Sequence, residues 1–167
     1  MLSVIAEAKA SVPSDSGSGA LAPPKVIISA CLLGEVCRYD GKTKRVSEVI
    51  SACKDYEIIP FCPEAPLFGT PRERINVIDI HGENRIFTDS TNRDVTKLLE
   101  DEINSFIKLN PDAQKIILKS KSPSCGLGTT PILNEQKEIL HNGNGIAAEI
   151  FQKNYKNIPI EDENSHL

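Results

Sequence analysis

The sequence predicts an α/β fold: a single layered domain with a mainly parallel sheet, helices on its faces and a small antiparallel insertion. Short apolar, β-branched runs alternate with amphipathic helical patterns, an order typical of parallel sheets covered by helices. A hairpin pattern interrupts this alternation at 76–88. The chain has 167 residues, a length that corresponds to one domain with a sizeable core.

The first half of the chain carries two of the predicted strands. Residues 9–24 are rich in Ser, Gly and Pro and have too little apolar surface to order themselves, so we expect a disordered leader over 1–24. The β-branched run at 25–30 predicts the first buried strand. Apolar spacing between 46 and 53 predicts a short helix, and 57–61 the second strand. Prolines and a glycine at 63–71 predict a long loop.

The second half begins with the hairpin and continues with a strongly periodic helix. Apolar residues recur every three or four positions from 95 to 107, which predicts a helix with one face on the sheet. We expect the folded domain to span 25–160. The remaining predicted elements are a third strand at 115–119, a small hairpin at 132–140, a closing helix at 145–153, a last strand at 158–160 and a polar, solvated tail at 161–167.

Composition excludes several classes of protein. The net charge is −4 and the pI is near 5.4, whereas general nucleic-acid and membrane-surface binders carry a basic excess. No apolar stretch is long enough to cross a bilayer, and the first residues do not form a signal peptide. The five cysteines are too sparse for a disulfide-stapled secreted domain. We therefore expect a cytoplasmic protein with free or metal-bound thiols.

Three cysteines follow apolar runs that read as parallel strands. Cys31 follows 25–30, Cys62 ends the run at 57–61, and Cys125 follows 115–119 after a polar loop. Because the carboxyl ends of parallel strands meet at one edge of a sheet, the three thiols are expected to gather there. Such a site would select zinc, copper(I) or an iron-sulfur cluster. One cysteine at a strand end is more often a small core residue, so the argument depends on all three.

Several polar residues adjoin these cysteines. Glu64 follows Cys62 by two positions, and Ser122 and Ser124 precede Cys125. Arg38, Arg72 and Arg74 could orient an anionic or carbonyl-bearing substrate, although such arginines more often are solvated or hold loop carboxylates. Arg38 and Arg72 are the stronger candidates because each lies beside a cysteine motif. Asp40 reads as a turn residue, and the glycines at 142–145 as a plain turn before a helix.

The strings SACLLGEVCRYDG, PFCPE, GTPR, KSKSPSCG and NGNGIAAEIF resemble the domain-of-unknown-function family that includes the thiouracil desulfidases. The resemblance covers 25–160. It implies an α/β domain that holds a 4Fe-4S cluster through Cys31, Cys62 and Cys125, whose open iron takes sulfur from a thiolated pyrimidine base or nucleoside without net redox change. It places the catalytic carboxylate on Glu64.

The resemblance also implies an active-site serine, which matches either Ser122 or Ser124. Cys37 then ranks as a substrate-pocket or auxiliary thiol, and Cys53, on the apolar side of a predicted helix, as core. The loop at 65–70 departs from the glycine-rich stretch usual in the family.

Two other hypotheses remain open at this point. The chain could be a non-enzymatic metal-binding or redox-sensing module with a three-cysteine site, or a structural protein with five buried thiols. Glu64 separates the enzyme from the sensor, because water attack needs a carboxylate beside the metal and a structural site does not.

Overall fold

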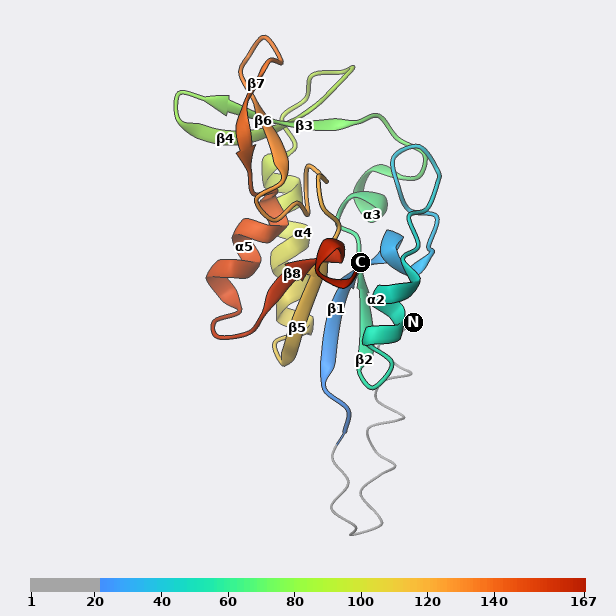
Figure 1. Cartoon of the computed structure of the whole chain (residues 1–167). Helices are drawn as coiled ribbons and strands as arrows, with labels where there is room; N and C mark the ends of the chain where they lie inside the picture. Colours follow the sequence, from blue (N-terminus) through green and yellow to red (C-terminus); the bar gives the residue numbers. More distant parts are fainter. Residues whose placement is uncertain (1–21) are drawn as a thin grey trace.

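The computed structural model describes residues 22–167, so most of the predicted leader at 1–24 lies outside the described residues. The described part contains two four-stranded sheets (Figure 1). In sheet A every neighbouring pair is parallel. Its strands, in spatial order, are β2 (Glu57–Phe61), β1 (Lys25–Ser29), β5 (Ala113–Leu118) and β8 (Ile160–Asp162).

Sheet A is buried on both faces. Side chains alternate along a strand, so Val26 and Ile28 pack in the core under α2 (Ser47–Ala52), while Ile27 lies in the core with α4 and α5. Figure 1 shows α4 (Thr96–Leu109) and α5 (Ile146–Asn154) together on one side of sheet A and α2 on the other. This three-layer arrangement confirms the predicted α/β class.

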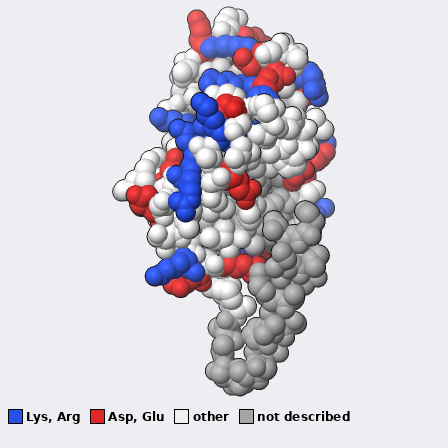
Figure 2. Space-filling model, turned by 90° about the vertical axis from the view of Figure 1, so that its right-hand side faces the viewer, with Lys and Arg blue, Asp and Glu red and all other residues white. Residues whose placement is uncertain are grey.

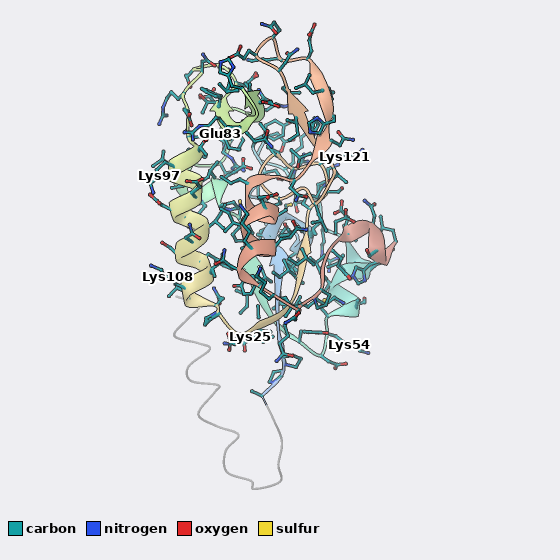
Figure 3. The ribbon with its side chains drawn as sticks, turned by 90° about the vertical axis from the view of Figure 1, so that its left-hand side faces the viewer. Lys25, Lys54, Glu83, Lys97, Lys108 and Lys121 are labelled. Carbon is teal, nitrogen blue, oxygen red and sulfur yellow. The ribbon has the colours of Figure 1, made fainter. Side chains whose placement is uncertain are left out.

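The helix α4 forms because its apolar positions make one continuous stripe. Leu99 and Ile103 are fully buried against the sheet, whereas Lys97 and Lys108 point away from it (Figure 3). Phe106 of α4 meets Phe61 at the end of β2, with ring centroids 4.7 Å apart, in a tilted pair. The predicted helix at 95–107 is therefore confirmed with small shifts of its ends.

The predicted antiparallel insertion at 76–88 is one half of a second sheet. Two hairpins build this mixed sheet B. In the first, β3 (Ile75–Ile80) pairs antiparallel with β4 (Glu83–Thr88), and in the second, β6 (Thr130–Leu133) pairs antiparallel with β7 (Ile139–Gly143). The two hairpins join through β3 and β6, which run parallel. Figure 1 shows sheet B beyond the carboxyl ends of the sheet A strands. The spatial order of the strands in sheet B is β4, β3, β6 and β7.

Three sequence expectations differ from the structure. The predicted loop at 63–71 contains a short helix, α3 (Glu64–Phe68), which tolerates Pro66 because first-turn N–H groups need no helical partner. The last strand is β8 rather than 158–160. The solvated end predicted at 161–163 is wrong for Glu163, which opens the 3-10 turn η3 (Glu163–His166) with 7% of its surface exposed. No helix within 22–167 is long and apolar enough to cross a membrane.

Candidate active site

A cavity of about 810 Å³ lies at the carboxyl ends of β1, β2 and β5. The loops that follow these three strands form much of its wall, as expected for the ligand-binding edge of an open α/β sheet. Residues of β3 and of the β6–β7 hairpin also line it. All nine predicted site residues are among the lining residues: Cys31, Cys37, Arg38, Cys62, Glu64, Arg72, Ser122, Ser124 and Cys125.

Cys31 is held at the cavity by the turn that ends β1. The 3-10 turn η2 (Ala30–Leu33) follows the strand directly, and Gly34 closes it in a left-handed conformation with φ of 97°. The Cys31 carbonyl accepts hydrogen bonds from the amides of Gly34 at 3.2 Å and Lys44 at 3.1 Å. The backbone of this cysteine is thus held by two segments of the chain. Cys31 is buried, with 8% of its surface exposed.

Cys62 lies at the junction of β2 and α3. Its Sγ accepts a hydrogen bond from the Ala65 amide at 3.4 Å, so the first turn of α3 is built against the sulfur. The same Sγ lies 3.9 Å from the Cys37 carbonyl oxygen. A hydrogen bond with the Cys31 thiol raises the pKa of Cys37 to about 11, and a hydrogen bond with Cys37 raises the pKa of Cys62. The thiols of Cys31, Cys37 and Cys62 are therefore neighbours.

Cys125 sits in the segment 119–125, which we call the Cys125 loop. The Ser122 hydroxyl accepts from the amides of Ser124 and Cys125, at 3.2 and 3.1 Å. The amide of Ala147, in the first turn of α5, donates to the Ser124 carbonyl at 2.7 Å. The glycine turn before α5 therefore positions the loop by backbone contact, in keeping with the predicted plain turn. Burial raises the pKa of the Cys125 thiol to about 12.

Cys53 does not line this cavity. It lies immediately after α2 and is fully buried in the core beneath that helix. Burial raises the pKa of its thiol. The prediction that Cys53 is a core residue is confirmed, and it provides a natural control for the other four thiols.

Glu64 is a buried carboxylate that lines the cavity. It is 7% exposed, its Oε2 accepts from the Ser124 hydroxyl at 2.6 Å, and its Oε1 pairs with Nε of Arg72 at 3.2 Å. Arg72 also donates to the carbonyl of Gly69 at 2.9 Å. The structure thus brings the carboxylate from the Cys62 motif and a serine from the Cys125 loop into direct contact.

The cavity wall is rich in cations. Arg38 lies near Asp40, with Nη1 to Oδ2 at 3.9 Å, and Arg74 stacks on the Tyr39 ring and donates to its hydroxyl at 2.6 Å. Figure 2 shows Lys and Arg side chains in a band over the upper half of one face, the half that holds sheet B. The basic lining residues are Arg38, Lys44, Arg72, Arg74, Lys119, Lys121 and Lys137.

Two further lining residues come from segments that the sequence analysis had singled out. Figure 3 shows Lys121, from the polar loop before Cys125, near the sheet B half and far from Lys25 at the amino end of β1. Arg74, considered as a substrate-orienting residue, also lines the cavity. Sequence reasoning missed Glu163, which comes from a segment that carried no motif. Glu163 lies in a short acidic run near the C-terminus, a pattern that usually indicates a solvated end.

Comparisons with known proteins show which family and which fold the chain resembles. A family model described as 2-thiouracil desulfurase matches residues 26–163. A Bacillus subtilis protein, the uncharacterized protein YbbK, is 31% identical over 112 residues, covering 62% of this chain and 74% of its own. The solved structure of the 4Fe-4S-dependent thiouracil desulfidase TudS superposes with a TM-score of 0.65 at 29% identity, covering 85% of this chain and 92% of TudS.

Proposed function

Because the chain belongs to the 2-thiouracil desulfurase family, we propose that it removes sulfur from a thiolated pyrimidine base or nucleoside with a 4Fe-4S cluster held by Cys31, Cys62 and Cys125. The carrying observation is the convergence of these three cysteines and Glu64 on one cavity. The family and the likeness to TudS identify the chain as a desulfidase. The proposal concerns its cofactor, its ligands and its catalytic residues.

The donor set fits an iron-sulfur cluster. Thiolates are soft ligands and select such clusters, zinc or copper(I). Cys31, Cys62 and Cys125 come from three separate loops that line one cavity, and the chain lacks the local Cys-x-x-Cys pairs of structural zinc ribbons. A 4Fe-4S cluster offers a separate iron to each thiolate. The likeness to the 4Fe-4S-dependent TudS supports the cluster over a single ion.

When bound through three cysteines, the cluster supplies an iron without a protein ligand that acts as a Lewis acid toward the substrate sulfur. Water then replaces sulfur at the ring carbon, giving the oxo base and hydrogen sulfide. We assign proton transfer from the attacking water to Oε2 of Glu64, with the Ser124 hydroxyl as its hydrogen-bond partner. Arg72 holds the other oxygen of the carboxylate and so fixes its orientation.

The two candidate serines have different partners. Ser124 is 1% exposed and contacts Glu64, whereas the Ser122 hydroxyl accepts from two backbone amides of its own loop. We therefore assign the catalytic role to Ser124 and a loop-shaping role to Ser122. Cys37 and Arg38, which line the cavity, are candidates for contact with the substrate ring. All described cysteines are free, which supports a reducing, cytoplasmic setting.

The test starts with protein purified without oxygen. We expect iron and acid-labile sulfide in equal amounts, and sulfide release from a panel of thiolated pyrimidines and their nucleosides. Cys31→Ala, Cys62→Ala and Cys125→Ala are each expected to lose the cluster, because a second iron then lacks a protein ligand. Cys53→Ala, the matched control, should keep it. Full iron occupancy in Cys125→Ala would contradict the ligand assignment, and bound iron without sulfide release from any thio-base would favour a redox-sensing module.

A further inference from the structure

We propose that Glu163 is a positioning residue that fixes the Cys125 loop from the C-terminal end of the chain. Its carboxylate is 7% exposed and takes no part in the chemistry assigned above. The inference rests on the proposed function, since it concerns the placement of a proposed cluster ligand and of Ser124. A buried carboxylate is costly unless it is paired, so its partners indicate what it does.

The polar partners of the Glu163 carboxylate are the first two residues of the Cys125 loop. The Ser120 amide donates to Oε1 at 2.8 Å and the Ser120 hydroxyl to Oε2 at 2.7 Å. Nζ of Lys119 lies 3.2 Å from Oε2. These charge-assisted bonds satisfy both oxygens of the carboxylate. The segment 119–120 is therefore bound to η3 by side chain and backbone together.

The parallel pairing of sheet A explains this placement. Leu118, the last residue of β5, is opposite Asp162 of β8 in the register, so the next residues along both strands leave the sheet side by side. Asp162 caps η3 by accepting from the Asn164 amide at 2.9 Å, which turns the chain back over the site. The first residue of that turn is Glu163, and it lies on the cavity wall.

A second tether holds the start of the same loop. The Lys119 amide donates to the Ser29 hydroxyl at 2.9 Å. Ser29 is 2% exposed and ends β1. Glu163 on one side and Ser29 on the other thus hold 119–120 between η3 and β1. Loss of the Glu163 carboxylate removes one of the two restraints on the start of the Cys125 loop.

The test uses full-length Glu163→Ala, Glu163→Gln and a matched control, Glu161→Ala. Glu161 is also a carboxylate of the C-terminal segment, but it pairs with Lys115 and His166 and not with the Cys125 loop. The first readout is the alkylation rate of each cysteine by iodoacetamide in the metal-free protein, mapped by mass spectrometry. The second is kcat and KM for sulfide release by the cluster-loaded protein.

In Glu163→Ala, Cys125 alkylation should rise by about tenfold, because losing charged hydrogen bonds shifts the local opening equilibrium. Cys53 should stay at its wild-type rate, and kcat should fall more than KM changes. Glu163→Gln keeps the shape and part of the hydrogen bonding, so it should lie between wild type and Glu163→Ala. Glu161→Ala should leave the Cys125 rate and kcat unchanged.

Equal rises at Cys125 and Cys53 would overturn the proposal, since they would show general loosening of the fold. An unchanged alkylation rate of Cys125 in Glu163→Ala would overturn the proposal as well. The same holds if the alkylation rate of Cys125 rose while kcat for sulfide release stayed at the wild-type value. The alkylation readout needs neither cluster nor activity. If the wild-type protein released no sulfide, the proposed function would fail while the restraint on Cys125 would still be decided.

Discussion

Gly145 offers a sharp test of how the site is built. A Cβ added to this glycine would lie 2.6 Å from the Ser124 carbonyl carbon, 2.8 Å from the Cys125 amide nitrogen and 2.8 Å from the Ser124 carbonyl oxygen. All three are backbone atoms of the Cys125 loop, so no side-chain rotation can relieve the contact. The backbone conformation itself, with φ of −68°, is open to alanine. The effect of Gly145→Ala therefore comes from the clash alone.

The size of the effect follows from these distances. Ordinary contact begins at 3.4 Å, so the nearest atom, now at 2.6 Å, must move by about 0.8 Å. Overpacking of this kind costs roughly 1–3 kcal/mol of folding free energy. A displacement near 1 Å at a reacting group lowers the rate by about a hundredfold. We expect Gly145→Ala to fold with a lowered Tm, to bind less iron and to release sulfide about a hundredfold more slowly.

The measurements are thermal unfolding, iron content after anaerobic purification and initial rates of sulfide release. Gly143→Ala is the matched control two residues away, because its Cβ would meet the Ile132 side chain, with Cγ1 at 3.2 Å, and no backbone of the Cys125 loop. This variant should keep its iron and its rate. If Gly145→Ala had the Tm, iron content and rate of wild type, the close backbone contact between α5 and the Cys125 loop would be refuted.

Three further predictions concern neighbouring groups. Glu64→Gln should keep its iron but release sulfide about 10²- to 10⁴-fold more slowly, as loss of a positioned acid-base group predicts; a wild-type rate would place proton transfer elsewhere. Ser124→Ala should lower kcat at full iron content, whereas Ser122→Ala should lower iron content first, and the reverse pattern would exchange their roles. Burial alone would raise the pKa of Asp94, yet hydrogen bonds from Thr96 hold this pKa below its usual value. The stabilisation of the fold by the Asp94 carboxylate is therefore present above pH ~4 and is lost as the pH falls through the lowered pKa. In urea unfolding, Asp94→Asn should cost roughly 0.2–1 kcal/mol at neutral pH and lose this deficit in acid, and a deficit that grew in acid would contradict the assignment.

The sequence predicted sheet A well because each of its central strands is a continuous apolar run. Parallel strands buried on both faces show no alternation, and the apolar runs within 25–30 and 115–119 stand out against polar flanks. Their parallel order also placed Cys31, Cys62 and Cys125 at one edge, and the structure brings all three to one cavity.

The missed features depend on contacts between distant segments. Sheet B forms because β3 pairs with β6, some fifty positions later along the chain, and short strands give no sequence signal for such partners. Sequence reasoning missed the helix α3 because prolines usually indicate a loop, although a proline is permitted in the first turn of a helix. Glu163 lies beside other acidic residues, and only the register of β8 on β5 shows that it turns inward.

The contacts of the Cys125 loop have a consequence for biosynthesis. During translation Cys31 and Cys62 leave the ribosome early, with their strands, whereas the loop is held by Ala147 of α5 and by Glu163 of η3. These partners lie further along the chain than the loop that they hold. The Cys125 loop therefore reaches its final place only after α5 and η3 have been made. Nascent chains stalled before α5 should not retain a cluster, so we expect iron-sulfur loading to follow the synthesis of η3.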